Sequence, residues 1–235
     1  MLGALANISW LATSQLEKVA DALSVTRYER RSTIFSDKSS SEAAYILLSG
    51  VARISCDNRK GRRTLVIMVS PGLIPEFPPA VAGITYNFRC EAVTNCEVGA
   101  IGLNTFMKIC LGISSASFKR MSAGLVGRWD RIHLRSSNIM GFTLEERLAL
   151  ALLDLSEDFG APYNRGRLQL TVPVRHGDLA EMVGSSRSRV SEHLSEFMQK
   201  QLISLQDRRL VVDHEGLRAF LKESHRERLS GEFRN

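Results

Sequence analysis

Residues 178–200, which read DLAEMVGSSRSRVSEHLSEFMQK, hold the side chains whose types and spacing best suit one chemical task. If the second half is a helix, the polar residues exposed near its N-terminal end are Arg187, Ser188, Ser191 and Glu192. A guanidinium can donate two hydrogen bonds to guanine, and a carboxylate can accept one from the amino group of cytosine. This face therefore has the chemistry needed to read base edges in the major groove of double-stranded DNA.

Two short helices joined by a tight turn are predicted to hold that face. Gly184 suits the turn because glycine adopts backbone conformations that are costly for other residues, and Ser186 is a good N-cap for the second helix. The apolar faces are formed by Leu179, Ala180 and Val183 before the turn and by Val190, Leu194 and Phe197 after it. The pattern is typical of a helix-turn-helix, although an ordinary helical hairpin with a solvated charged face would share it.

A β-hairpin is predicted directly after the second helix. Runs 202–205 and 209–212 flank a short polar turn. Such a wing typically lies against the DNA backbone, so Arg208 and Arg209 are predicted phosphate contacts. Arg189, round the side of the second helix, is a further one. Together these elements predict a winged helix-turn-helix.

Charge alone does not locate a DNA-binding surface. The 235 residues carry a formal net charge of +6 and a pI near 9.4, which suits a polyanionic partner but is also common in proteins that never bind nucleic acid. Residues 171–235 are nearly balanced in sign, and the basic excess lies in segments 59–63 and 119–135. The prediction of DNA binding therefore rests on the motif.

Other function classes find little support. There is no Gly-rich phosphate loop, no His-Glu zinc helix motif and no nucleophile elbow, so we expect no enzyme. We expect no metal and no cofactor, because no paired metal-site spacing occurs among Cys56, Cys90, Cys96 and Cys110. Without a targeting segment or a long apolar run, we expect a cytoplasmic protein with no membrane partner. The alternative function is a ligand-binding module whose helix-turn-helix contacts proteins instead of DNA.

An α+β architecture in three parts is predicted to position the motif. A helix over 14–23 is followed by short apolar or alternating runs at 45–48, 51–55, 64–69 and 91–101. About eight such strands suggest a jelly roll, or double-stranded β-helix, over residues 1–111. A long helix follows over 112–140, and Gly141 marks a hinge before the DNA-binding part, 141–235.

Local signals place further elements in the DNA-binding part. Thr143 and Glu146 have capping-box spacing, which predicts a helix beginning at Leu144. Its predicted buried residues are Leu148, Leu152, Leu155 and Phe159. Segment 168–174 alternates like a strand, and Pro173 within it indicates an edge position in a sheet.

A narrow apolar stripe on the long helix predicts a dimer seam. The residues on or beside this stripe are Phe118, Met121, Leu125, Trp129, Ile132 and Ile139. Arginines occupy other faces, so the stripe suits one partner helix, as in a coiled coil. A helix lying on the sheet of its own domain is the alternative.

These features together resemble the CRP/FNR family of dimeric bacterial regulators. The resemblance covers about residues 16–220 and is most specific in VGSSRSRVSEHL followed by QLISLQDRRLVV. Segment 145–160 with the later VRHGDLAEMVG resembles the nitrogen-control branch in particular. The resemblance implies a cyclic-nucleotide-binding-like β-roll that senses a signal, a homodimer, a palindromic operator and contact with RNA polymerase.

The resemblance also assigns roles within the second helix. The base-reading positions are Arg187, Ser188 and Glu192, and the residues near phosphate are Ser186 and Arg189. Glu192 stands where many members have arginine, so we expect a half-site that differs from the family's common sequences. His193 stands at a position that is usually apolar, and we expect a partly buried core residue there and not a ligand.

The nucleotide-binding cassette of the family is altered in this chain. Aligned on residues 96–98, its phosphate-binding Arg-Ser pair becomes Tyr86 and Asn87, and its base-contacting hydroxyl pair becomes Ile132 and His133. Because a buried phosphate would lose its charged partner, we expect no tight cAMP binding and an effector other than cAMP or none. The residues expected in the pocket region are Gly72, Glu76, Tyr86, Asn87, Arg89 and His133.

Overall fold

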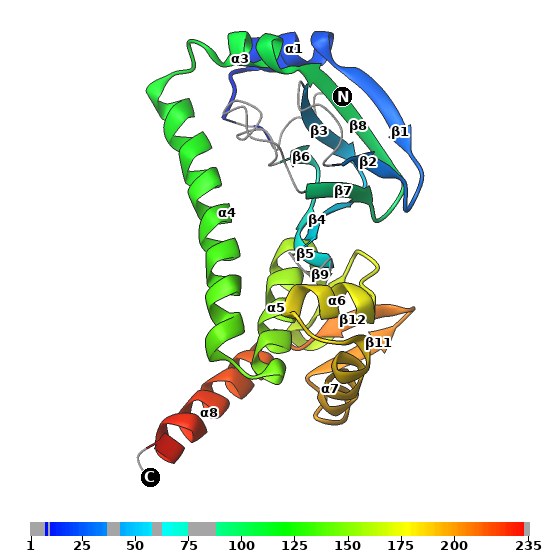
Figure 1. Cartoon of the computed structure of the whole chain (residues 1–235), viewed down its shortest axis with the longest axis vertical. Coiled ribbons are helices and arrows are strands. Elements are labelled where there is room, and N and C mark those ends of the chain that lie inside the picture. Colours follow the sequence, from blue (N-terminus) through cyan, green and yellow to red (C-terminus); the bar gives the residue numbers. More distant parts are fainter. Residues whose placement is uncertain (1–7, 9, 37–42, 58–62, 75–87, 233–235) are drawn as a thin grey trace. The chain divides into compact units, whose positions relative to one another are not determined.

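The computed structural model describes residue 8 and residues 10–36, 43–57, 63–74 and 88–232 (Figure 1). The chain divides into two compact units, Met1–Ile132 and His133–Asn235. The division falls within one long helix, α4, which spans Ser115–Gly141. No helix in the described part of the chain is long and apolar enough to cross a membrane.

Two antiparallel sheets form the first unit, which confirms the predicted jelly roll. Their strand orders are β1-β8-β3-β6 and β2-β7-β4-β5. The strands are β1 (Ser24–Tyr28), β2 (Thr33–Phe35), β3 (Ala43–Ser49), β4 (Ala52–Asp57), β5 (Arg63–Val69), β6 (Gly72–Leu73), β7 (Phe88–Ala92) and β8 (Cys96–Gly102). The helix predicted over 14–23 is present as α1, Thr13–Ala22.

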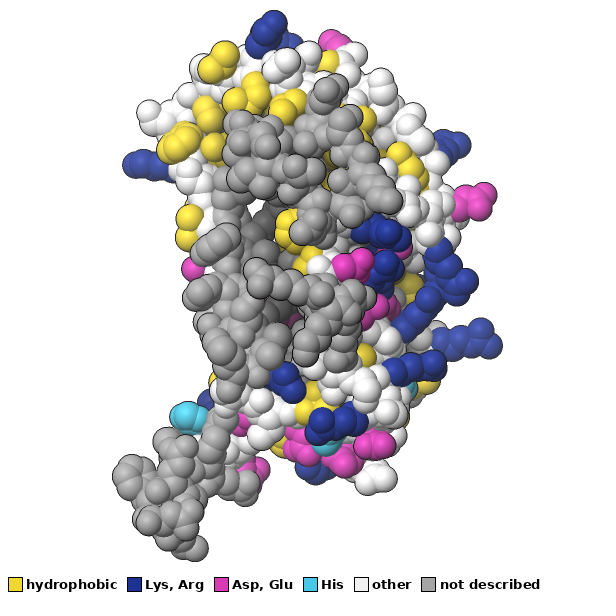
Figure 2. Space-filling model, in the orientation of Figure 1, with side chains coloured by type: hydrophobic (Ala, Val, Ile, Leu, Met, Phe, Trp, Pro, Cys, Tyr) yellow, Lys and Arg dark blue, Asp and Glu magenta, His cyan; other side chains and the backbone are white. Residues whose placement is uncertain are grey.

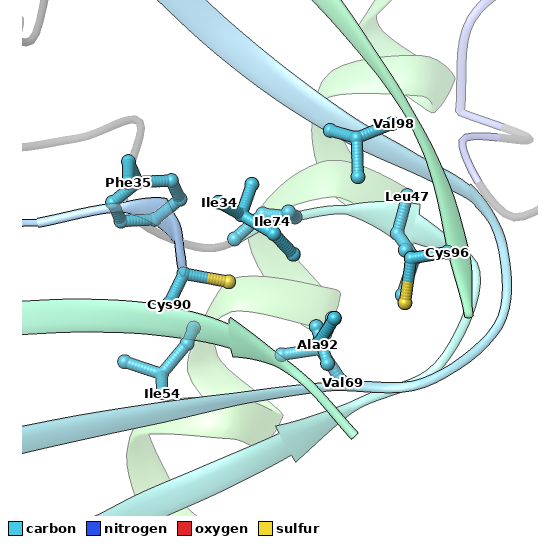
Figure 3. Close-up of a cluster of buried hydrophobic side chains, with 11 residues drawn as sticks. Ile34, Phe35, Leu47, Ile54, Val69, Ile74, Cys90, Ala92, Cys96 and Val98 are labelled. Carbon is cyan, nitrogen blue, oxygen red and sulfur yellow. The ribbon is translucent and has the colours of Figure 1, made fainter. Parts of the chain in front are cut away.

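Side-chain alternation along the strands builds two cores in this unit. Leu47 of β3 belongs to the first cluster, which strands of both sheets supply (Figure 3). Its neighbours Ile46 and Leu48 belong to a second cluster with Val19 of α1 and Phe106 of α3, the helix Leu103–Cys110. Because β3 buries both of its faces, its sequence is a continuous apolar run and does not alternate with polar residues.

The run 91–101, expected as one strand, is instead the end of β7, a turn and β8, and the two strands lie in different sheets. The turn is held by Val51, whose carbonyl accepts from the amides of Val93 and Thr94 at 2.8 and 3.2 Å. The adjacent Gly50 has φ +88°, and a Cβ there would lie 2.3 Å from the Asn95 carbonyl oxygen. Both strands bury apolar side chains, so the sequence pattern continues through the bend that these contacts create.

Helix α4 is present near the predicted range of 112–140, but it begins three residues later and includes Gly141. It starts after Ser114, whose hydroxyl accepts from the amide of Ser117 at 3.1 Å, and it ends at Gly141. On the expected apolar stripe, Phe118 is 56% exposed and Met121 is half-buried. The side chains of the other stripe residues lie outside the described part of the structure, namely Leu125, Trp129, Ile132 and Ile139.

The second unit combines helices with one antiparallel sheet of order β11-β12-β10-β9. Its helices are α5 (Leu144–Phe159), α6 (His176–Val183), α7 (Arg187–Gln199) and α8 (His214–Glu232). Its strands are β9 (Gly160–Pro162), β10 (Leu168–Leu170), β11 (Ile203–Gln206) and β12 (Arg209–Val212). The predicted mixed α+β class is thus confirmed in this unit as well.

The edge position inferred from Pro173 is wrong. Strand β10 ends at Leu170, so Pro173 lies outside it, and β10 is an inner strand between β12 and β9. Proline has no amide hydrogen to donate to a neighbouring strand, so it does not fit within an inner strand. Pro173 lies beyond the end of β10 and therefore costs the sheet no hydrogen bond.

Helix α5 starts where the capping box predicted. The Thr143 hydroxyl accepts from the Glu146 amide at 3.2 Å, and the Glu146 carboxylate accepts from the Thr143 amide at 2.8 Å. Glu146 is itself buried, and its second oxygen accepts from the Ser224 hydroxyl of α8 at 2.8 Å. The four predicted core residues Leu148, Leu152, Leu155 and Phe159 are all buried. Capping thus anchors α5 to α8 across 78 residues of sequence.

Candidate nucleic-acid interface

The helix pair expected in residues 178–200 is formed by α6 and α7. Gly184 ends α6 in the left-handed conformation, with φ 65° and ψ 42°, a geometry that glycine adopts without strain. Ser186 then caps α7, because its side-chain oxygen accepts from the Arg189 amide at 3.4 Å. Gly184 therefore forms the turn, and Ser186 the N-cap, that the sequence predicted.

Apolar contacts lock the two helices together. All six predicted packing residues are buried: Leu179, Ala180, Val183, Val190, Leu194 and Phe197. Phe197 also meets the ring of Phe220 in α8 edge to face, with centroids 5.4 Å apart. The orientation of α7 is therefore set by its buried side, which leaves the opposite side to solvent.

The predicted reading face lies in solvent at the N-terminal end of α7. The exposed residues there are Ser186, Arg187, Ser188, Arg189 and Glu192. The hydroxyls of Ser186 and Ser188 lie 3.1 Å apart, and the Ser186 hydroxyl is also the helix cap. Among the described residues, Arg187 and Glu192 have no side-chain partner, and both are exposed, so their donor and acceptor groups face solvent.

Ser191 was predicted to be exposed on the same face, but its hydroxyl bonds to other groups of the protein. It donates to the carbonyl of Arg187 at 2.9 Å and lies 2.7 Å from Nδ1 of His176. The residue is half-buried. These contacts indicate that Ser191 holds the predicted reading face in place and does not form part of it. Spacing along the sequence could not reveal the contact with His176.

The start of α6 lacks a hydroxyl cap but keeps half of a capping box. Arg175 is the N-cap residue, and its guanidinium has no acceptor to offer a helix amide. Its own amide, however, donates to the carboxylate of Asp178 at 3.0 Å. This bond, together with the acidic charge in the first turn, stabilises the start of the helix.

Arg147 of α5 is a further cationic residue near the reading helix, and the sequence did not indicate it. Burial is the larger cause, and repulsion from Arg189 the smaller, of a pKa of the Arg147 guanidinium below its ordinary value. Nε of Arg147 is buried and finds no hydrogen-bond partner among the described residues. Two guanidiniums that repel each other at a protein surface favour an anion between them. The signal is invisible in the sequence because 41 residues separate the pair.

The predicted wing is present as the β11–β12 hairpin. Gln206 pairs with Arg209, and the two residues between them, Asp207 and Arg208, have φ values of 50° and 62°. Positive φ at both central positions is the geometry of a type I′ turn, whose twist matches that of the strands. Arg208 and Arg209 are both exposed. The hairpin therefore carries two free-standing cationic side chains at its tip.

Basic side chains on the visible face lie close to acidic ones (Figure 2). The charge of residues 171–235 is nearly balanced in sign. The local arrangement of α7 and the wing, and not a broad basic field, distinguishes this interface.

The expected effector region is described only in part. Glu76, Tyr86 and Asn87 and the side chain of His133 lie outside the described residues. Gly72 is buried with φ 144° at the start of β6. Arg89 alternates with the core residues Cys90 and Ala92 and so lies on the other face of its strand.

That outer face carries a cluster of arginines around one carboxylate. Nη1 of Arg89 lies 3.9 Å from Glu91, which also accepts from Nε of Arg53 at 3.1 Å and lies 3.8 Å from Arg63. Arg89 is thus engaged with neighbours on the surface of the sheet.

Comparison with known proteins agrees with both units. Residues 25–112 match the family model of the cyclic nucleotide-binding domain, and residues 146–220 match that of the Crp-like helix-turn-helix domain. The global nitrogen regulator of Synechococcus elongatus is 23% identical over 81% of this chain and 86% of its own length. The CRP-like cAMP-activated global transcriptional regulator of Mycobacterium tuberculosis is 22% identical over 85% and 88%.

Solved structures share the fold over most of the chain. The c-di-GMP-responsive global regulator CLP of Xanthomonas campestris matches with a TM-score of 0.70 at 19% identity, covering 86% of this chain and 99% of that one. The two family models meet the winged helix-turn-helix and the β-roll at the places where the sequence predicted them. The chain belongs to the CRP/FNR family of transcription regulators.

Proposed function

We propose that the protein binds a palindromic operator in double-stranded DNA as a homodimer, with one α7 helix in the major groove of each half-site. The observation that carries this proposal is the exposed N-terminal end of α7, where Arg187, Ser188 and Glu192 stand on a helix oriented by its buried side. A helix held in this way can present donors and acceptors to base edges without losing order.

The three residues have distinct roles in base reading. Arg187 donates two hydrogen bonds to a guanine, and Glu192 accepts from the amino group of a cytosine. Ser188 adds a small hydroxyl that fits several bases. One basic and one acidic reader together predict a half-site with two G·C base pairs a few positions apart, one read at its guanine by Arg187 and one at its cytosine by Glu192.

Phosphate contacts surround this reading face. Arg189 on α7 and Arg208 and Arg209 at the wing supply exposed cations, and Ser186 supplies a hydroxyl at the helix N-terminus, where anions are favoured. We add Arg147 to this set, because a phosphate between Arg147 and Arg189 relieves their mutual repulsion.

A dimer would form along α4. Phe118 on the predicted stripe exposes 56% of its surface, although it is a large apolar residue on a helix of 27 residues. A second copy of α4 packed along the stripe would remove its ring from water. Two half-sites read by a symmetric dimer lie one DNA turn apart, about 34 Å.

The first unit would sense an effector other than cAMP, or none. Tyr86 and Asn87 stand where the resemblance places the pair that grips the cyclic phosphate, and neither offers a positive charge. Arg89, the nearest described arginine, is engaged by Glu91 on the outer face of its sheet. Any effector acts through a difference between its affinities for the arrangement that binds DNA and the one that does not. The resemblance further suggests contact with RNA polymerase and a cytoplasmic location.

Selection of bound sequences from a random DNA pool, with and without cell extract, tests the proposal. We expect the selected sequences to contain an inverted repeat. Selection that succeeds only with cell extract would reveal an effector. On the selected operator, Arg187→Ala should cost about 1–3 kcal/mol of binding free energy and relax the preference at one base pair.

The matched control is Arg226→Ala on α8, which removes the same charge from an exposed site outside the interface. Equal affinities of the Arg187→Ala variant, the control and the unaltered protein would refute base reading by α7. They would favour a helix-turn-helix that contacts proteins.

A further inference from the structure

Three side chains from two helices of the second unit converge on one point. Nδ1 of His193 lies 3.3 Å from a carboxylate oxygen of Glu145 and 3.1 Å from one of Glu196. Glu145 is in the first turn of α5, and His193 and Glu196 lie one turn apart on α7. One ligand atom of each residue lies within 4.8 Å of the other two, and all three residues are partly buried.

The charges of this cluster are not balanced by the protein. Two carboxylates share one imidazole nitrogen, which can donate a single proton. Among the described residues, neither carboxylate pairs with a lysine or an arginine. Glu196 also lies in the last turn of α7, where the helix dipole disfavours negative charge, and that turn holds no basic residue. The cluster therefore favours an added cation.

We propose that Glu145, His193 and Glu196 form a binding site for a divalent transition-metal ion such as Zn²⁺. Imidazole nitrogen and carboxylate oxygen are both zinc ligands, whereas the histidine disfavours Mg²⁺ and Ca²⁺, which take oxygen ligands. Ligands bonded at about 2.0–2.2 Å to a tetrahedral ion lie about 3.4 Å apart. The distances of 3.3 and 3.1 Å from Nδ1 to the two carboxylates are close to this spacing.

The ion joins the DNA-reading helix to the start of α5. Three protein ligands leave the fourth position of a tetrahedral ion to water or another ligand. Since α5 begins three residues after Gly141, the end of α4, the site ties α7 to the segment that follows the long helix. Metal binding at these residues requires no DNA, so the site stands or falls independently of the proposed function.

Titration of the tag-free full chain with ZnCl₂, after chelator treatment and dialysis, tests the site by calorimetry. We expect one ion bound per chain and a higher unfolding midpoint in its presence. Glu196→Gln should weaken the affinity at least about tenfold and reduce the midpoint shift accordingly. The Glu196 side chain is 46% exposed, so the variant should fold, which circular dichroism of the metal-free protein verifies.

The matched control is Glu157→Gln, because Glu157 lies 3.5 Å from another histidine, His214, but belongs to no cluster of three ligands in the described residues. Its zinc affinity should equal that of the unaltered chain. The four cysteines, Cys56 to Cys110, all lie outside the proposed site, so zinc bound to their thiolates would be a different site. Binding of Co²⁺ in place of Zn²⁺ distinguishes the two, because thiolate ligands give cobalt a charge-transfer band. Absence of zinc binding, equal binding by Glu196→Gln and the unaltered chain, or a thiolate-to-cobalt charge-transfer band would overturn the proposal.

Discussion

Nδ1 of His176, at the start of α6, lies 2.7 Å from the hydroxyl of Ser191 in α7. The same hydroxyl donates to the carbonyl of Arg187 at 2.9 Å. A hydroxyl that donates its one proton to the Arg187 carbonyl can still accept a hydrogen bond, and the His176 tautomer with hydrogen on Nδ1 supplies the matching donor. The first residue of one helix is thereby connected to the backbone of the residue proposed to read guanine in the next.

We expect His176 and Ser191 to be energetically coupled. A part-buried hydrogen bond of this kind contributes about 0.5–1.5 kcal/mol, so His176→Ala and Ser191→Ala should show a coupling energy of that size in a double-mutant cycle. Urea unfolding of the four proteins measures it. Ser195 supplies the control, since its hydroxyl donates only to the carbonyl of Ser191, and its removal should add independently to His176→Ala. Additive effects for His176 and Ser191 would contradict the link.

Arg147 should act on DNA affinity without acting on sequence preference. Arg147→Gln removes one phosphate contact, so we expect affinity to fall for operator and random DNA alike and the slope of log K against log salt to decrease by about one. Fluorescence anisotropy at several salt concentrations measures both. Arg226→Ala should leave the slope unaltered, and an unchanged slope in Arg147→Gln would exclude the residue from the interface.

Phe118 should matter for association and little for folding of the single chain. Its ring is 56% exposed, so Phe118→Asp removes few internal contacts, whereas a charge in a helix seam opposes dimer formation. Sedimentation equilibrium should show a shift from dimer to monomer. Val25→Asp is the matched control, because Val25 is 48% exposed on a strand of the same unit. If both variants associate like the unaltered protein, α4 is not the seam.

Cys110 should be a slowly reacting thiol at neutral pH. Burial raises the pKa of Cys110 to about 11, and only the thiolate attacks alkylating agents. The alkylation rate at this residue should therefore rise about tenfold per pH unit through the alkaline range and level off only near pH 11. Mass spectrometry of iodoacetamide-treated protein follows the rate, and urea-unfolded protein reports the ordinary thiol. Fast labelling of native Cys110 at pH 7 would point to a redox function.

Signals that act over a few residues were sufficient to predict the reading unit. Gly184 closes the turn, Ser186 caps α7, and Thr143 with Glu146 starts α5, each as expected. Periodic apolar residues set which side of each helix is buried, so the exposure of Arg187 and its neighbours followed from the spacing. The sequence predicted these features because each depends on hydrogen bonds or burial patterns within one helix.

Tertiary structure decided what depends on residues far apart in the chain. The bend within 91–101 is created by hydrogen bonds to Val51, and the inner place of β10 follows from its pairing with β12. The cluster of Glu145, His193 and Glu196 likewise exists only because α5 and α7 pack together. Local sequence by itself determined the reading helix and its cap. Packing between distant segments brought the remaining charges and ligands within reach, and spacing along the chain carries no measure of that distance.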